Sequence, residues 1–195
     1  MVRVLAVNNY PTRERFVRLE NCLKGNGASV TSIDWDGAST SAFDSFDGVV
    51  LSGSPDMMSE GKTQSKYSRE IESILDSKSP IFGVCFGHQM IASAFGSKVV
   101  KDGRHVLEMV KTEVLSGDPL FDGLPRTMML LESRHEVVKT LPRGFELLAS
   151  SSTSKIATMK HRSRPLYGVQ FHPERFTKEH PDGDWVVGNF VRMLR

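Results

Sequence analysis

Residues 81–96 of the chain read IFGVCFGHQMIASAFG, and the rest of the fold can be predicted outward from them. A short apolar run leads into Cys85, and apolar residues at helical spacing follow as far as Gly96. This pattern predicts a strand, a sharp turn and a helix. Gly83 and Gly87 flank the cysteine at minus two and plus two, which matches a nucleophile held on a strained turn between small neighbours.

Cys85 is therefore a candidate nucleophile. At a helix N-terminus, unpaired N–H groups and the helix dipole favour the thiolate, which is the form of cysteine that attacks. The alternative is a buried cysteine acting as a small hydrophobic side chain, the commoner role of an isolated cysteine. The two glycines and the change from strand to helix favour the nucleophile. Cys22, on the apolar face of a predicted helix, is expected in the core.

The composition is that of an ordinary globular protein, and we expect a single domain over residues 1–195. A chain of this length buries about 70% of its unfolded surface without needing disulfides or metal. Charged residues make up 25% of the chain and the net charge is +2, without the basic stripe typical of nucleic-acid binding. Two cysteines far apart indicate a reducing cytoplasm. No apolar run approaches eighteen residues, so no membrane span or signal peptide is expected.

Apolar runs at Val2–Val7, Ala28–Ile33 and Gly48–Leu51 predict strands, with a helix starting after Thr12. This alternation predicts an α/β fold with a flavodoxin-like, doubly wound, mostly parallel sheet and helices on both faces. Trp35 and Phe43 are expected in a polar loop. A strand-rich second half follows Gly96. The remaining expected elements are a helix at Gln64–Leu75, strands at Lys98–Val100, Arg104–Leu115, Thr127–Glu132, Phe145–Ser150, Ile156–Met159 and Leu166–Phe171, and a helix at Trp185–Leu194.

The turn-rich loop at residues 52–58 follows the third strand, at the sheet edge where open α/β folds bind ligands. It could present a backbone N–H to a developing oxyanion, or it could be a plain turn. The segment Gly61-Lys62-Thr63 ends like a phosphate-binding loop. However, Asp56 stands where that motif requires its first glycine, so we reject a nucleotide site there.

A thiol nucleophile needs a base and a group that orients the base. His172 ends an apolar strand and precedes Pro173, which favours extended backbone, so Glu174 should point to the same side and hold the imidazole. A lone histidine at a strand end is usually structural, but the cysteine turn favours a Cys-His-Glu triad. His88 could shape the pocket, and His135 could approach it from a loop. His161 and His180 look like exposed loop residues. No histidine pair has metal-ligand spacing, so neither metal nor cofactor is expected.

Two motifs, GVCFGHQ at residues 83–89 and YGVQFHPE at residues 167–174, make the chain resemble class I glutamine amidotransferases. Within that family it is most similar to the separate glutaminase subunit of archaeal-type GMP synthetases. The resemblance implies that Cys85 forms a γ-glutamyl thioester with glutamine, that His172 shuttles a proton and that Glu174 orients His172. It also implies the remaining site residues: an oxyanion hole from the N–H groups of Ser54 and Phe86, and substrate contacts from Gly53, Gln89, Ser133, Arg134 and His135.

The chain departs from the family pattern at three places. Ser54 stands where a second glycine is usual, and a serine would be strained there if the backbone needed positive φ. The stretch at residues 133–136 reads SRHE where Ser-His-x-Asp is usual, which bears on the substrate and on coupling to a synthetase. The start of the chain reads NNYP at residues 8–11, unlike the usual Asp-Asn-Gly-Gly-like start.

Three functions follow from these observations. The first is a glutaminase that supplies ammonia to a separate synthetase subunit, with GMP synthesis as the candidate. The second is a stand-alone γ-glutamyl hydrolase or related enzyme with another γ-glutamyl substrate. The third, a non-catalytic binding protein on this fold, is disfavoured because all three triad residues are present. The basic segment at residues 155–164 could contact a partner or form a solvated hairpin.

Overall fold

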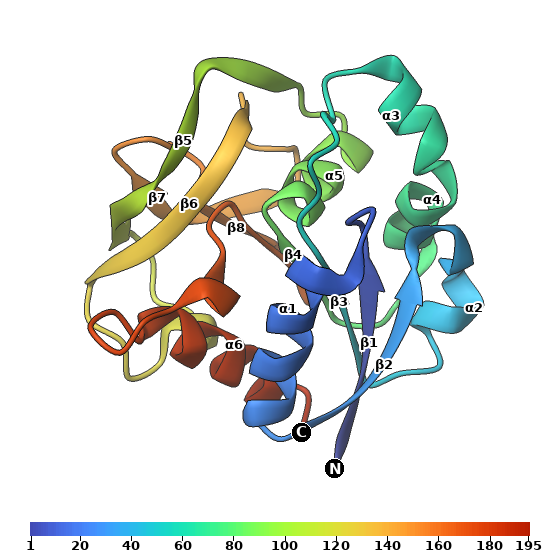
Figure 1. The fold of residues 1–195 in the computed structure, drawn as a ribbon, viewed down its shortest axis with the longest axis horizontal. Helices are drawn as coiled ribbons and strands as arrows, with labels where there is room; N and C mark the ends of the chain where they lie inside the picture. Colours follow the sequence, from blue (N-terminus) through green and yellow to red (C-terminus); the bar gives the residue numbers. More distant parts are fainter.

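The structure, a computed structural model of residues 1–195, is built on one nine-stranded sheet. Five neighbouring strands run parallel, and the other four continue the sheet in antiparallel pairs (Figure 1). In sheet order the parallel strands are β2 (Ala28–Asp34), β1 (Val2–Asn8), β3 (Gly48–Leu51), β4 (Ile81–Val84) and β9 (Leu166–Val169). The antiparallel strands that follow are β8 (Thr158–His161), β7 (Phe145–Ser151), β5 (Val99–Val114) and β6 (Thr127–Val138).

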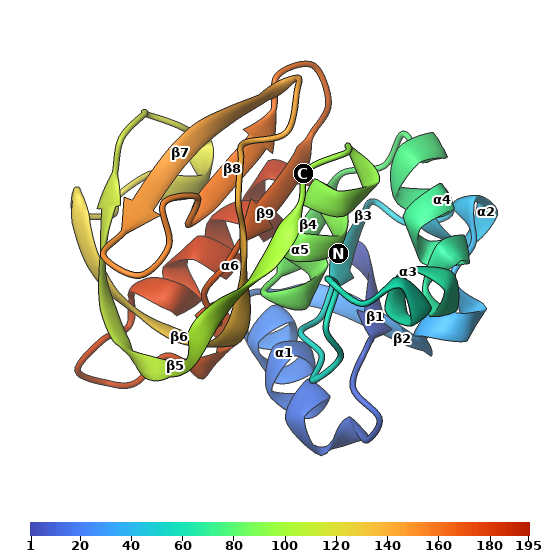
Figure 2. The same ribbon diagram turned by 90° about the horizontal axis from the view of Figure 1, so that it is seen from above.

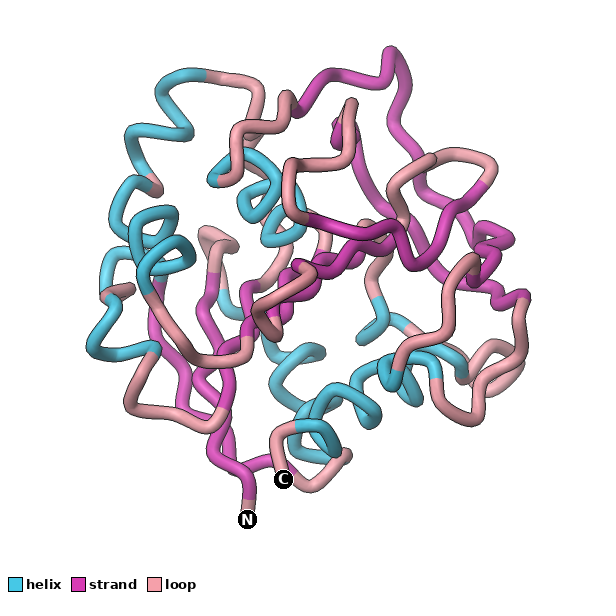
Figure 3. Tube along the Cα trace, turned by 180° about the vertical axis from the view of Figure 1, so that it is seen from behind, coloured by secondary structure: helices cyan, strands magenta, loops and turns pink.

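Helices cover both faces of the sheet, and the view from behind shows the strands running between them (Figure 3). The helices α1 (Arg13–Gly25) and α6 (Asp182–Met193) pack against each other on one face. The other face is covered by α2 (Thr40–Phe43), α4 (Ser68–Asp76) and α5 (Phe86–Ala94), and α3 (Gly61–Lys66) precedes α4. Three 3-10 turns complete the elements: η1 (Trp35–Gly37), η2 (Pro119–Phe121) and η3 (Pro173–Arg175).

Two apolar cores, one on each face, follow from the alternation of side chains along the strands. In β1, Val4 and Ala6 pack with α1 and α6, whereas Leu5 and Val7 pack with the helices of the opposite face. Because both faces are covered, the central strands are apolar throughout. This is why β1, β3 and β4 were predictable, and the doubly wound fold class is confirmed.

The sheet order brings the carboxyl ends of β1, β3, β4 and β9 together at one edge. Parallel strands end at the same side, so the segments that follow them converge there. These segments are residues 9–12, residues 52–58, Cys85 and residues 170–172. The long pair β5 and β6 curves along the side of the molecule toward this edge (Figure 2).

Several predicted boundaries in the first half were wrong. The expected polar loop around Trp35 and Phe43 contains η1 and α2. The single helix expected at Gln64–Leu75 is two helices, because the backbone of Tyr67 leaves the helical region between α3 and α4. The last helix starts at Asp182, three residues earlier than the sequence indicated.

The strand-rich half is more continuous than expected. The predicted strands Lys98–Val100 and Arg104–Leu115 form one strand, β5, with an irregularity between Lys101 and Val106. The prediction Thr127–Glu132 stopped six residues short of the end of β6. The expected strand Ile156–Met159 is displaced to β8. No helix in the structure has the length and apolar character to cross a membrane.

The Phe190 side chain is 1% exposed and stacks on Phe82, with ring centroids 5.0 Å apart. We expect Phe190→Ala to lower the free energy of unfolding by about 3–5 kcal/mol, because it leaves a cavity between α6 and the sheet. Urea unfolding measures the change. Phe176→Ala is the matched control, since Phe176 is 42% exposed and its loss should change stability little. Equal stability of the two variants would contradict this packing.

Candidate active site

The turn at Cys85 has the strained geometry predicted from its flanking glycines. Cys85 has φ of 50° and ψ of −95°, and it is the one non-glycine residue with positive φ. A Cβ on Gly83 would lie 2.6 Å from the Gly87 carbonyl group, and a Cβ on Gly87 would lie 2.7 Å from Leu51 O. Real Cβ atoms do not approach other atoms this closely, so both positions require glycine.

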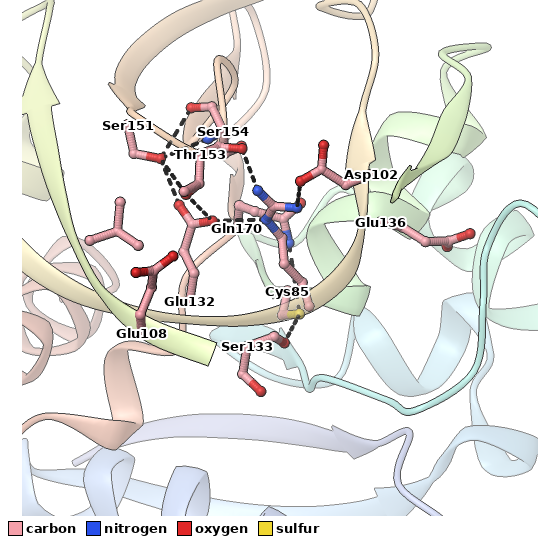
Figure 4. Close-up of polar contacts among 12 residues, drawn as sticks. Cys85, Asp102, Glu108, Glu132, Ser133, Glu136, Ser151, Thr153, Ser154 and Gln170 are labelled. Carbon is pink, nitrogen blue, oxygen red and sulfur yellow. Dashed lines mark hydrogen bonds and ion pairs between the residues drawn. The ribbon is translucent and has the colours of Figure 1, made fainter. Parts of the chain in front are cut away.

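Backbone and side-chain contacts hold the thiol at the edge of the sheet. The Cys85 N–H donates to Val169 O at 2.8 Å, which fixes the turn against β9. The thiol lies 3.5 Å from Ser133 O, and Gln170 Nε2 donates to Sγ at 3.7 Å (Figure 4). The sulfur therefore sits between β6 and the end of β9, with Cys85 5% exposed.

His172 and Glu174 form a buried pair. Nδ1 of His172 lies 2.8 Å from Oε1 of Glu174, and the two side chains are 5% and 4% exposed. The predicted pairing is present, but the backbone reason was wrong: the two residues meet through the 3-10 turn η3, and not along an extended strand. The His172 N–H donates to Leu131 O at 2.7 Å and fixes this turn against β6.

The charges around His172 favour its protonated form. Burial disfavours a charged imidazole, but the Glu174 carboxylate and the Cys85 sulfur outweigh it and raise the pKa of His172 well above its ordinary value. An imidazolium beside the sulfur stabilises a thiolate. The pair therefore presents a nucleophile together with a proton donor.

Two backbone N–H groups at the end of the sheet have no acceptor in the protein. They belong to Ser54, in the loop after β3, and to Phe86, the first residue of α5. The loop is fixed near its start, because Ser52 N–H donates to Val7 O at 3.1 Å and Gly87 N–H donates to Ser52 O at 3.2 Å. The φ of Ser54 is not positive, so serine replaces the family's glycine without backbone strain.

A cavity of about 620 Å³ opens at this edge of the sheet. It is lined by eight of the predicted residues, namely Cys85, His172, Glu174, Ser54, Gln89, Ser133, Arg134 and His135. Gly53 lies buried beneath the wall, where an added Cβ would meet the Tyr10 hydroxyl at 2.4 Å and His172 Cε1 at 2.9 Å. The Phe86 ring packs in the core, so this residue can reach the cavity through its N–H alone.

The predicted stretch at residues 133–136 lies on β6, and not on a loop. Side chains therefore alternate, with Arg134 buried and His135 exposed. The Arg134 guanidinium, 0% exposed, pairs with Glu132 and Asp102 at 2.8 Å each and donates to Thr153 O (Figure 4). Of Arg134, only the backbone can contact a substrate.

Three cavity residues were missed by the sequence analysis. Tyr10 places its hydroxyl over Gly53, from the loop after β1. Gln170 is fully buried beside the sulfur, and its position two residues before His172 was the available signal. His105 stacks on His135, with ring centroids 4.2 Å apart. Its place in the irregular part of β5 gave no sequence signal.

Other predicted roles are corrected by the structure. His88 does not shape the cavity; it is fully buried against Gly168, and burial lowers its pKa to about 4. His161 lies at the end of β8 and not in an exposed loop. The basic segment at residues 155–164 includes β8, an inner strand of the sheet. Within it, Lys160 pairs with Asp118 at 2.7 Å, and Arg164 donates to three backbone carbonyls.

A parallel sheet that presents a cysteine turn, a His-Glu pair and two free N–H groups at one edge defines an enzyme of acyl transfer. The model of the glutamine amidotransferase class-I family matches residues 15–192. The chain belongs to this family and is a glutamine-hydrolysing enzyme.

Among curated proteins, the chain is similar to one of the subunits of the glutamine-hydrolysing GMP synthases of two archaea. Identity is 39% with the Pyrococcus abyssi protein and 41% with the Thermococcus kodakarensis protein, each over 146 residues, 75% of this chain and 74% of the relative. Among solved structures, a putative GMP synthase subunit from Thermoplasma acidophilum superposes with a TM-score of 0.87 and 30% identity, covering 100% of this chain and 94% of the other.

We expect Gly53→Ala to reduce kcat/KM for glutamine by roughly 100-fold, because the new methyl group would displace the Tyr10 hydroxyl or the His172 imidazole. Glutamate release measures the effect. Gly61→Ala is the matched control, because an added Cβ there meets no atom within 4 Å. Full activity of Gly53→Ala would show that the loop after β3 is not packed against these side chains.

Replacing Arg134 by Met should lower the free energy of unfolding by about 3–5 kcal/mol, because the Glu132 carboxylate would remain buried without its cation. The second change Glu132→Gln should recover part of the loss. Arg126→Met, which breaks an exposed pair with Glu113, should cost less than about 1 kcal/mol. Urea unfolding compares the variants, and Arg134→Met as stable as Arg126→Met would refute the account.

Proposed function

We propose that Cys85, His172 and Glu174 release ammonia from glutamine for a separate synthetase subunit that makes GMP. The observation that carries this proposal is the buried His172–Glu174 pair lining one cavity with Cys85 and the Ser54 N–H. The similarity to subunits of archaeal glutamine-hydrolysing GMP synthases supports the choice of partner and product.

In the acylation step, the Cys85 thiolate attacks the carbon of the glutamine side-chain amide, and a C–S bond forms. The carbonyl oxygen becomes an oxyanion, which accepts hydrogen bonds from the N–H groups of Ser54 and Phe86. The C–N bond then breaks, and the leaving nitrogen takes a proton from the His172 imidazolium. Ammonia and a γ-glutamyl thioester are the products of this step.

In the second step, water attacks the thioester carbon and gives a proton to the neutral His172. The C–S bond breaks, so that glutamate leaves and Cys85 returns as a thiolate beside an imidazolium. Glu174 holds the ring through Nδ1, which keeps Nε2 available for both proton transfers. The net reaction converts glutamine and water into glutamate and ammonia.

Glutamine enters between the loop after β3 and strand β6. Gln89, whose Nε2 donates to Glu136 O at 2.9 Å, joins α5 to this strand and lines the cavity. Ser133 and His135 offer their backbone and exposed atoms to the substrate. Arg134 serves the site by stiffening the strand behind Ser133, since its guanidinium is occupied.

Glutamate release should disappear in Cys85→Ala and persist in Cys22→Ala, a matched control with the other cysteine. Burial and the neighbouring Asp184 raise the pKa of the Cys22 thiol far above its ordinary value, so iodoacetamide should label Cys85 alone in the folded protein. Residual turnover in Cys85→Ala would refute the thioester mechanism.

Addition of the synthetase subunit should stimulate glutamate release and allow glutamine to serve as the nitrogen source for GMP. Glutamate release without any stimulation or GMP formation would refute the proposed partner. Cys85-dependent turnover of other γ-glutamyl compounds, with none of glutamine, would favour a stand-alone γ-glutamyl hydrolase instead.

A further inference from the structure

Glu70 is a fully buried acid that the triad does not use. It lies on α4, is 0% exposed, and makes one side-chain hydrogen bond, from Asn9 Nδ2 to Oε1 at 3.1 Å. Its other oxygen, Oε2, has no partner, and neither has Asn9 Oδ1. Two acceptors are thus buried without a donor, which is costly unless one of the groups carries a proton.

A neutral carboxylic acid at Glu70 supplies the missing donor. Its O–H can be donated within the pair it already forms with the Asn9 amide. Burial raises the pKa of Glu70 to about 8, and the hydrogen bond from Asn9 opposes this rise only in part. No ion pair reaches it: α2, α3, α5 and η1 pack on α4, and their titratable groups Asp36, Lys62, Lys66 and His88 do not contribute to its pKa.

Asn9 connects this acid to the loop after β3. Its N–H donates to Ser52 Oγ at 2.8 Å, and Ser52 Oγ in turn lies 2.9 Å from Gly53 O. Ser52 O accepts from Gly87 N–H at the start of α5. Asn9 therefore touches the residue that joins the loop to the cysteine turn.

The junction between α3 and α4 supports the same loop. The Tyr67 hydroxyl lies 3.3 Å from Asn9 O and 2.9 Å from Asp56 Oδ2. Both ends of the Ser52–Asp56 segment thus depend on residues at the start of α4. Ser54, whose N–H faces no acceptor, lies between them.

We propose that Glu70, as a neutral acid, is a positioning residue: it fixes Asn9, and Asn9 fixes Ser52 and the loop that presents the Ser54 N–H. The inference rests on the proposed function, because it gives that N–H its role in catalysis. An ionised Glu70 loses its O–H and becomes an unpaired buried charge, so the loop loses its support as pH rises.

The test compares Glu70→Gln with Glu70→Leu, and uses Glu72→Gln, an exposed change on the same helix, as control. Glutamate release is measured with the synthetase subunit present. Glutamine retains a donor and an acceptor, so Glu70→Gln should stay within about twofold of the native kcat at pH 7, whereas Glu70→Leu should lose roughly 10- to 100-fold with a smaller change in KM.

The pH profile separates positioning from simple packing. Native activity should fall as pH rises through about 8, where Glu70 ionises, and Glu70→Gln should retain activity to higher pH. An unchanged alkaline limb in Glu70→Gln would overturn the proposal, and so would native activity in Glu70→Leu. If Glu70→Leu does not fold, the profile of Glu70→Gln decides alone.

A double variant tests the route through Ser52. Ser52→Ala removes the acceptor for the Asn9 N–H, so Glu70→Leu with Ser52→Ala should lose little more than the worse single variant, whereas additive losses would overturn the route. Iodoacetamide should label Cys85 at the native rate in these variants, because alkylation needs no oxyanion hole. A native protein that releases no glutamate would instead refute the proposed function.

Discussion

The backbones of α5 and β3 meet with no space for a side chain, and the geometry of the site depends on this contact. A Cβ on Gly87 would fall 2.7 Å from Leu51 O, so the helix can start directly beside the strand only because a glycine stands there. The contact forces the sharp turn at Cys85 and lets Gly87 N–H bind Ser52 O at 3.2 Å. The nucleophile and the loop that faces it are thereby set in one step, and surrounding hydrogen bonds hold the strained φ in place.

Buried polar groups then fix the segments that the sheet brings together. The Arg134 network joins three segments, namely β6, the irregular part of β5 and the loop after β7, behind the Ser133 carbonyl that contacts the sulfur. On the other side of the site, Asn9 and Tyr67 connect the loop after β3 to α4. Such groups are costly when unpaired, so each arrangement favours one position of its loop. The resting site is therefore held rigid from both sides.

The success of the sequence analysis varied with how each segment is buried. The strands β1, β3 and β4 are apolar on both faces, so their apolar runs predicted them well. Strand β6 was cut short at Glu132 because its next residues are polar, although several are buried in ion pairs and hydrogen bonds. The exposed residues between Lys101 and Val106 look like a gap between strands, yet β5 continues through them.

The sequence by itself determined the doubly wound fold, the family, the cysteine turn and the pairing of His172 with Glu174, because each is encoded by residues close together in the chain. Only the tertiary structure decided which distant residues share the cavity. Tyr10 reaches Gly53, Gln170 reaches Cys85 and His105 reaches His135 across separations set by strand order and β5–β6 register. The same alternation turned the Arg134 guanidinium away from the substrate. Local patterns carry no information about such contacts, because they arise when a sheet places segments remote in sequence side by side.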